Sequence, residues 1–265
     1  MKLYNEDCLK GMKRLDDESI DLVVTSPPYD NLRTYNGFSF DFKGTAKELY
    51  RVVKQGGVVV WIVSDSTVNG SETGTSFKQA LFFKEIGFNL HDTMIWRKIS
   101  PFTHKNRYIA DFEYMFVFSK GKPKTTNIIC DRKNKWGGTP VHGTLQQKND
   151  GKLAEINGKG KRKVKEYGAR YNVWDIPPEK NNRTGHPAVF PRAIAKDHIL
   201  SWSNKGDTVL DPFSGSGTTA IEAINNGREF IGFEISKEYY DKSLQRINDE
   251  TAQMNLFSLA GSEGK

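Results

Sequence analysis

Residues 207–220 read Asp-Thr-Val-Leu-Asp-Pro-Phe-Ser-Gly-Ser-Gly-Thr-Thr-Ala, a short apolar strand followed by a glycine-rich turn that enters a helix. Gly215, Gly217 and Ala220 form the pattern G-x-G-x-x-A, which lets the backbone approach a ligand closely at the carboxyl edge of a strand. Glu234 ends the next strand, 17 residues after Gly217, and an acidic side chain there can bind both hydroxyls of a ribose. Together these features predict a cofactor that contains a nucleoside.

Three classes of nucleoside cofactor compete for this turn. A nucleoside triphosphate needs the pattern G-x-x-x-x-G-K-[ST], and the turn has no lysine. A dinucleotide places its pyrophosphate on bare N–H groups at the helix start, whereas Asp211 brings a carboxylate to the same opening. A carboxylate suits a cationic ligand such as the amine and sulfonium of S-adenosylmethionine. A tight turn without a ligand would explain the glycines but neither the Asp-Pro-Phe prefix nor Glu234.

A second motif, Thr-Ser-Pro-Pro-Tyr at residues 25–29, follows directly after the apolar run 20–24. Its two prolines end the strand and stiffen a loop at the sheet edge where open α/β sheets bind their ligands. The prolines have no N–H, so this turn offers carbonyl acceptors, to which Ser26 adds a hydroxyl and Tyr29 an aromatic face. Acceptors beside a stacking ring suit the exocyclic amine of a flat base. The alternative interpretation is a surface turn stiffened by proline.

Helices and strands alternate on both sides of these motifs, which indicates an α/β fold with a mostly parallel sheet. We predict strands at 20–24, 57–63, 91–96, 112–118, 207–210 and 229–233, and helices at 45–54, 76–86, 190–202, 218–226 and 237–249. From about residue 120 to 180 the apolar periodicity gives way to Lys, Gly, Asn and Thr, and residues 258–265 read as a flexible tail.

The composition excludes several classes of protein. The 265 residues are 37% hydrophobic and 27% charged, unlike collagen-like, disordered or disulfide-scaffold chains. Cys8 and Cys130 are far apart and lack metal-ligand spacing, so we expect a reducing compartment and no metal site. The longest apolar run, 58–63, is far shorter than the roughly 20 residues of a membrane span, and the start of the chain has no signal-peptide core. We therefore expect a cytoplasmic protein.

Positive charge is concentrated in the middle of the chain. The net charge is +7, yet residues 97–170 hold 18 Lys and Arg against 6 Asp and Glu, a net charge of +12, which leaves −5 for the rest. Such a block is compatible with a surface that faces the phosphate backbone of nucleic acid. A solvated, lysine-rich insertion would give the same pattern.

The motifs and their order resemble those of the amino-methylating DNA methyltransferases of the N4-cytosine/N6-adenine type, in the circularly permuted arrangement called the beta class. The resemblance rests on Asp7, on residues 25–29, 48–57, 186–191 (His-Pro-Ala-Val-Phe-Pro) and 211–219, and on Glu234. It implies a Rossmann-like, doubly wound, mostly parallel seven-stranded sheet. Residues 1–119 would form the catalytic half, 120–180 a basic target recognition region, and 181–257 the cofactor-binding half.

The resemblance also assigns roles to single residues. Ser26, Pro27, Pro28 and Tyr29 would form the catalytic loop around a base flipped out of double-stranded DNA. The residues that would bind S-adenosylmethionine are Asp7, His186, Asp211, Phe213, Gly215, Gly217, Thr218 and Glu234. Asp7 reads equally well as the N-cap of a helix over 9–15, and His186 as a packed or capping side chain. Trp136, His142, Trp174 and Arg183 are candidate DNA contacts, although tryptophans are more often core residues.

The expected reaction is methyl transfer to cytosine N4 in a restriction-modification or phage-protection setting, because Ser26 opens the Ser-Pro-Pro-Tyr sequence and residues 186–191 look like those of N4-cytosine enzymes. Adenine N6 is the alternative. Neither cysteine follows a proline, as the nucleophile of carbon-5 cytosine methylation would. A non-catalytic nucleic-acid-binding module and a dehydrogenase are weaker alternatives. A cognate restriction endonuclease is a candidate partner, and a monomer and a homodimer are both open.

Overall fold

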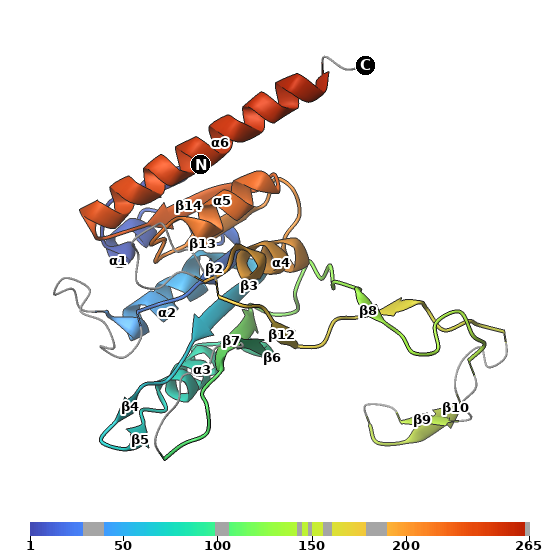
Figure 1. Ribbon diagram of the computed structural model, residues 1–265. Coiled ribbons are helices and arrows are strands. Elements are labelled where there is room, and N and C mark those ends of the chain that lie inside the picture. The colour runs from blue at the N-terminus through green and yellow to red at the C-terminus, as the bar shows by residue number, and fades with distance from the viewer. Residues whose placement is uncertain are drawn as a thin grey trace. The chain divides into compact units, whose positions relative to one another are not determined.

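A computed structural model of the chain describes residues 1–28, 40–98, 106–141, 145–147, 150–155, 161–178 and 190–262 (Figure 1). Contacts between Cα atoms divide it into two compact units. The main unit combines Met1–Asn127 with Asn172–Lys265, and the second unit is Ile128–Tyr171. The second unit lies inside the basic segment 120–180 that the sequence sets apart.

The main unit is built on one eight-stranded sheet with the order β1-β14-β13-β2-β3-β7-β6-β12. Neighbours from β1 to β3 run parallel, and so do β6 and β12, whereas β7 is antiparallel to both β3 and β6. The strands are β1 (Lys2–Tyr4), β2 (Ile20–Thr25), β3 (Val53–Val63), β6 (Asn89–Arg97), β7 (Phe112–Ser119), β12 (Val173–Asp175), β13 (Thr208–Asp211) and β14 (Glu229–Phe233), with a hairpin of β4 (Thr67–Val68) and β5 (Ser71–Glu72) outside the sheet.

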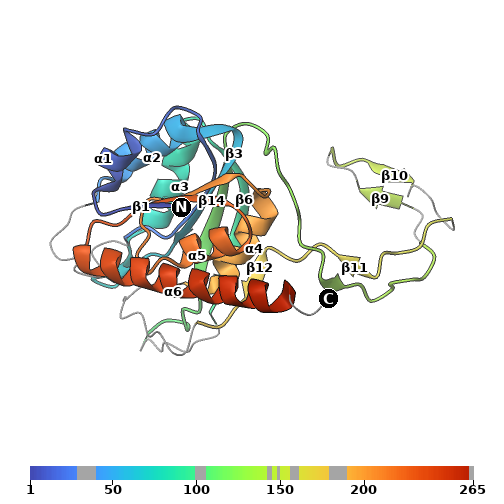
Figure 2. The ribbon, with the colours of Figure 1, turned by 90° about the horizontal axis from the view of Figure 1, so that it is seen from above.

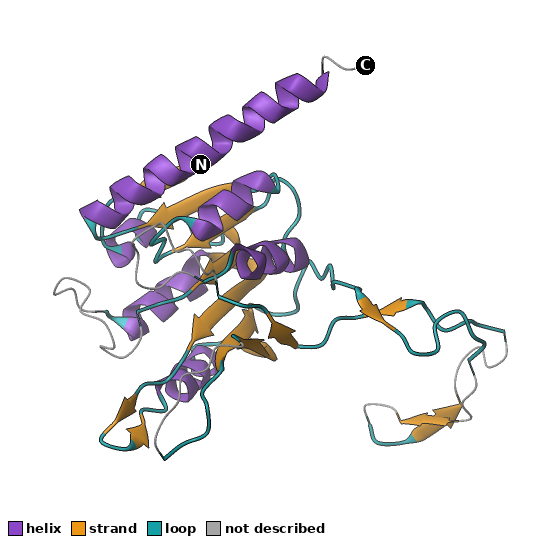
Figure 3. Cartoon of the chain, in the orientation of Figure 1, coloured by secondary structure: helices purple, strands orange, loops and turns teal. Residues whose placement is uncertain are grey.

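Helices cover both faces of this sheet, as Figures 2 and 3 show. They are α1 (Cys8–Met12), α2 (Phe42–Val52), α3 (Thr75–Glu85), α4 (Arg192–Trp202), α5 (Thr218–Asn225) and α6 (Lys237–Ser262). The continuous apolar run of β3 explains the three layers, because successive side chains of a strand point to opposite faces. Val58, Val60 and Ile62 pack in the core beneath α4, α5 and α6. Val59, Trp61 and Val63 pack in the other core, beneath α1, α2 and α3.

The structure confirms the α/β class and the mostly parallel sheet, and it differs from the sequence analysis in detail. The sheet has eight strands among the described residues rather than seven, because β12 pairs with β6 at its edge. The three residues of β12 are too few to show periodicity, so the sequence analysis included residues 173–175 in the basic segment 120–180. Helix α6 continues to Ser262, beyond the expected end at residue 249. Trp174 of β12 is a core residue.

The second unit consists of two small antiparallel ribbons. They are β8 (Arg132–Lys133) with β11 (Tyr167–Gly168), and β9 (Leu145–Gln147) with β10 (Leu153–Glu155). None of the side chains whose burial is described in this unit is buried. The unit is therefore held together by hydrogen bonds and not by a hydrophobic core. One of them belongs to the ion pair between Arg170 and Asp131.

Candidate active site

Four of the predicted site residues lie at the carboxyl ends of four neighbouring parallel strands. Asp7 follows β1, Glu234 follows β14, Asp211 ends β13 and Ser26 follows β2. These strands are adjacent in the order β1-β14-β13-β2. Parallel strands present their carboxyl ends at one edge, where α/β sheets bind ligands. Residues more than 200 positions apart in the sequence therefore share one site.

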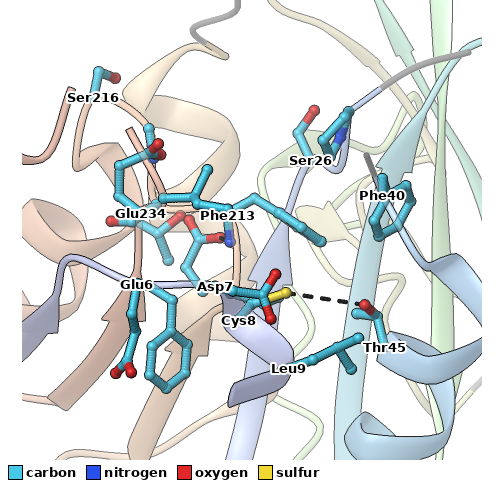
Figure 4. Close-up of a pocket in the computed structure, with 18 of the residues that line it drawn as sticks. Glu6, Asp7, Cys8, Leu9, Ser26, Phe40, Thr45, Phe213, Ser216 and Glu234 are labelled. Carbon is cyan, nitrogen blue, oxygen red and sulfur yellow. Dashed lines mark hydrogen bonds between the residues drawn. The ribbon is translucent and has the colours of Figure 1, made fainter. Parts of the chain in front are cut away.

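A pocket that is partly open to solvent lies at this edge (Figure 4). Its described lining includes five carboxylates and neither lysine nor arginine. The acidic residues are Glu6, Asp7, Asp41, Asp211 and Glu234. Arg14, outside this lining, pairs with Glu6. The charge of the other four favours a cationic ligand and disfavours the phosphates of a nucleotide or dinucleotide.

Both sequence motifs line this pocket. Ser26 and Pro28 come from the first, and residues 211–216, 218 and 219 come from the second. Phe213 packs edge-on against Phe40, with ring centroids 5.1 Å apart. Pro27 is buried and is absent from the described lining. The two predicted site residues Tyr29 and His186 lie outside the described residues.

Glu234 is held by backbone donors at the end of β14. Gly215 N donates to its Oε2 at 2.9 Å, and Ser236 N donates to its Oε1 at 2.8 Å. Burial is the largest influence on its pKa and raises it, while these two hydrogen bonds act in the opposite direction. A carboxylate fixed in this way still has acceptor positions for the hydroxyls of a ribose.

The glycine-rich turn has the backbone that only glycine adopts easily. Gly215 has a φ of +50° and Gly217 a φ of +79°. Gly217 is the N-cap of α5 and is not among the described lining residues. A Cβ atom there would lie 3.1 Å from Ile247 Cδ1 of α6, so this glycine also allows the last helix to pack on the turn.

Sequence reasoning missed several residues that shape the site. Arg246 of α6 donates to Ser216 O at 2.9 Å and to Thr218 Oγ1 at 3.1 Å, which fixes the turn from outside. Asp41 lines the pocket and is the N-cap of α2, where its side chain accepts from Gly44 N. The Asp-x-x-Gly spacing before the helix was a capping signal. No pattern indicated that Arg246 faces the turn.

Asp7 is a helix cap that also lies at the pocket. Its side chain accepts a hydrogen bond from Lys10 N at 3.1 Å, so it is the N-cap of α1. It also lines the pocket. Figure 4 shows Asp7 beside Cys8 and Leu9, which belong to the same first turn. A capping carboxylate keeps acceptor positions beyond the one used by the backbone.

Asp211 is the buried acid of the site. Its Oδ1 accepts from Thr25 Oγ1 at 2.6 Å and from Phe213 N at 3.0 Å. Complete burial raises its pKa from 3.8 to about 6, and the hydrogen bonds from Thr25, Thr219 and Phe213 N partly oppose that rise. Burial of a charge without a cation nearby is costly. A cation bound beside Asp211 would therefore lower the free-energy cost of its buried negative charge.

The raised pKa predicts how Asp211→Asn changes stability with pH. Between pH 3.8 and about 6 the native protein binds this proton more tightly than the unfolded chain, so the contribution of Asp211 to stability falls as pH rises. The stability of Asp211→Asn relative to wild type should therefore increase by roughly 3 kcal/mol from pH 3.5 to pH 8. Urea unfolding at several pH values measures this difference. A difference that stays constant with pH would contradict the burial argument.

The two cysteines should differ sharply in reactivity. Burial, with a smaller contribution from Asp7, raises the pKa of the Cys8 thiol to about 12, whereas Cys130 is exposed. At pH 8 we expect a maleimide to label the native protein once and the urea-unfolded protein twice, counted by mass spectrometry, because the thiolate is the reactive form. Cys130→Ser is the control, and its native form should stay unlabelled. Rapid labelling of Cys8 in that variant would disprove this description.

Residues 20–245 match a family model described as DNA methylase, which covers N6 and N4 methyltransferases. The match spans well over half of the chain, and the chain belongs to this DNA methylase family. The resemblance predicted from the motifs is thereby confirmed. The protein is a DNA methyltransferase of the N4-cytosine/N6-adenine family. Within the described residues, no helix has the length and apolarity needed to cross a membrane.

A curated relative and two solved structures are similar over most of this chain. The orphan methyltransferase M.BamHII of Bacillus amyloliquefaciens is 56% identical over 246 residues, which cover 89% of this chain and 92% of the relative. A DNA modification methylase of Thermus thermophilus, in complex with S-adenosyl-L-methionine, has a TM-score of 0.65 and 25% identity, covering 94% of this chain and 93% of that one. The cytosine-N4-specific PvuII DNA methyltransferase has a TM-score of 0.70 and 21% identity, covering 94% and 90%, and shows the shared fold.

Proposed function

We propose that this DNA methyltransferase transfers the methyl group of S-adenosylmethionine to the exocyclic amine of a flipped base, with cytosine N4 as the favoured target. The observation that carries the proposal is that a single pocket is lined both by Ser26 and Pro28 of the first motif and by Phe213, Gly215 and Glu234. A donor site and an acceptor loop meet there. The setting that we propose is restriction-modification or phage protection.

The residues of the pocket fit this cofactor. The carboxylates of the lining match its sulfonium and ammonium charges. We assign Glu234 to the ribose hydroxyls and Asp7 to the adenine. Ser214 Oγ is buried and, among the described residues, lacks a hydrogen-bond partner, as expected of a group that meets a ligand. When bound, the cofactor supplies a methyl group on positively charged sulfur that a nucleophile can attack directly.

The catalytic loop acts on the target amine. That nitrogen is a weak nucleophile because its lone pair is delocalised into the ring. Ser26 Oγ and the Pro27 carbonyl oxygen would accept hydrogen bonds from the two N–H groups of the amine. These bonds would favour a tetrahedral nitrogen whose lone pair faces the methyl group. The amine would form the new N–C bond as the S–C bond breaks, the electron pair of the S–C bond would stay on sulfur, and the amine would release one proton to solvent. The hydrogen bonds strengthen as positive charge develops on nitrogen, so they stabilise the transition state more than the ground state.

Access to this loop requires that the base leave the duplex. Flipping costs a few kcal/mol, and stacking on Tyr29 would offset about 1–3 kcal/mol of it. Ser26 is the acceptor that led us to favour cytosine. A serine and an aspartate both provide an oxygen acceptor, so adenine N6 is the alternative target.

We propose that the second unit is the target recognition region for double-stranded DNA. Of the 39 Lys and Arg in the chain 11 lie at 128–171, and of the 32 Asp and Glu only 4, so this unit has a net charge of +7 and the rest carries 28 of each sign. Trp136 is 65% exposed there, with Lys135 Nζ 5.4 Å from the ring centroid. Exposed aromatic and cationic groups suit contact with nucleic acid.

Nucleoside analysis tests the proposed reaction. The protein is incubated with methyl-labelled S-adenosylmethionine and duplex DNA, and the DNA is digested and analysed by mass spectrometry. We expect N4-methylcytosine; N6-methyladenine would establish the alternative target. DNA binding without any methylated nucleoside would indicate a non-catalytic module. Calorimetry with S-adenosylmethionine and with NAD serves as the cofactor control, and tight binding of NAD alone would overturn the assignment. A cognate endonuclease and the oligomeric state stay predictions.

A further inference from the structure

The two motifs of the site are joined by a buried hydrogen bond. Thr25 is the last residue of β2, directly before Ser26, and Asp211 is the last residue of β13. Thr25 Oγ1 donates to Asp211 Oδ1 at 2.6 Å, and both residues are at most 1% exposed. The registered pairing of β2 with β13 ends at Val23 and Leu210, two residues before Thr25 and one residue before Asp211. Side chains therefore continue the link between the strands where the backbone pairing stops.

A second contact supports the same link. Thr219 lies in the first turn of α5, and its Oγ1 donates to Val24 O at 3.3 Å. Asp211 Oδ1 also accepts from Phe213 N, so the carboxylate that receives Thr25 fixes the start of the cofactor turn as well. Thr25 and Asp211, which directly precede Ser26 and Pro212, therefore belong to one hydrogen-bonded group.

We propose that Thr25 is a positioning residue for methyl transfer, whose hydrogen bond to Asp211 sets the separation between the catalytic loop and the cofactor pocket. The inference rests on the proposed function, because it concerns the distance between the target amine and the methyl group. Thr25 is absent from the described pocket lining and acts through Asp211 and Ser26. A methyl-transfer site is sensitive to such a distance, since a displacement of about 1 Å can cost about 100-fold in rate.

The type of residue fits this role. A β-branched side chain suits the end of a buried strand, and valine would fill the same volume. Valine would leave the buried carboxylate of Asp211 without the hydrogen bond from Thr25 Oγ1. If burial alone explained the threonine, valine would serve equally well. The hydroxyl is therefore the group to test.

The experiment compares Thr25→Val with Thr25→Ser in steady-state methylation of duplex DNA by the full chain. For Thr25→Val we expect kcat to fall by about 30-fold or more while KM for S-adenosylmethionine changes by less than about 3-fold. Thr25→Ser retains the donor, and we expect it to recover kcat to within about 5-fold of wild type. Ser201→Ala, which removes a buried hydroxyl bonded within its own helix α4, is the matched control with unchanged kcat.

The outcomes separate this inference from the proposed function. If wild type transfers no methyl group, the proposed function fails. If wild type is active and Thr25→Val keeps its kcat, the positioning role is disproved. An equal loss in both Thr25 variants, or a loss confined to KM, would also disprove it. Should Thr25→Val not fold, as judged by circular dichroism, Thr219→Val removes the second contact and must show the same fall in kcat.

Discussion

Replacement of Ser26 by alanine should lower kcat for DNA methylation by about 100-fold and leave the dissociation constant of S-adenosylmethionine within about 2-fold of wild type. Ser26 follows β2 at the carboxyl edge and lines the same pocket as Glu234. Its hydroxyl would accept a hydrogen bond that strengthens only as charge develops on the amine. Removal of such an interaction affects the transition state rather than cofactor binding. Single-turnover kinetics and calorimetry measure the two quantities separately.

Two further variants show whether the loss in Ser26→Ala is specific to the catalytic loop. Ser201→Ala, on α4, shows what loss of an unrelated buried serine does, and it should retain full turnover. Tyr29→Ala should also lose turnover and retain cofactor binding, since the resemblance gives Tyr29 the stacking role. Unchanged turnover in both Ser26→Ala and Tyr29→Ala would end the assignment of residues 25–29 as the catalytic loop.

The affinity for duplex DNA should fall by about 1,000-fold between 50 and 200 mM salt, the loss typical of about six phosphate contacts. The physical cause is the release of counterions from the DNA when Lys and Arg neutralise its phosphates. The second unit supplies this charge, because it holds the whole net charge of +7. Fluorescence anisotropy of a labelled duplex at a series of salt concentrations gives the slope of log Kd against log salt.

Charge-removing variants locate the contacts. Lys161 and Lys163 are exposed in the second unit. Changing both to glutamine should reduce the magnitude of the salt slope by about 1.8. The matched control changes Lys237 and Lys242, whose charges pair with Asp241 and Glu238 on α6, and should leave the slope unchanged. A slope near zero for wild type, or equal effects of both pairs, would contradict the proposed placement of the DNA.

Most of the main unit was predictable because its signals are local. The apolar run 57–63 indicated a strand covered on both faces, and β3 is buried between two helix layers. The helix predicted over 45–54 ends at Val52, because Val53 is already extended and begins β3. The short strands β1 and β12 were not predicted, because three residues show no periodicity. Both nevertheless form the edges of the sheet.

The candidate site was predictable where a motif stands at the end of a strand. Asp211, Phe213 and Glu234 line one pocket with Ser26, as their places after parallel strands indicated. Arg246 and Asp41 were not predictable as site residues, because each reaches the pocket region from a helix whose packing the sequence does not state.

The sequence by itself determined the class of fold, the two chemical motifs and the concentration of positive charge at 97–170, because strand alternation, turn residues and charge are properties of short segments. Only the tertiary structure decided that Thr25 donates to Asp211, 186 residues away, and that Gly217 must leave room for Ile247. Contacts of this kind depend on strand order and on the packing of side chains across layers. No local pattern encodes either of them.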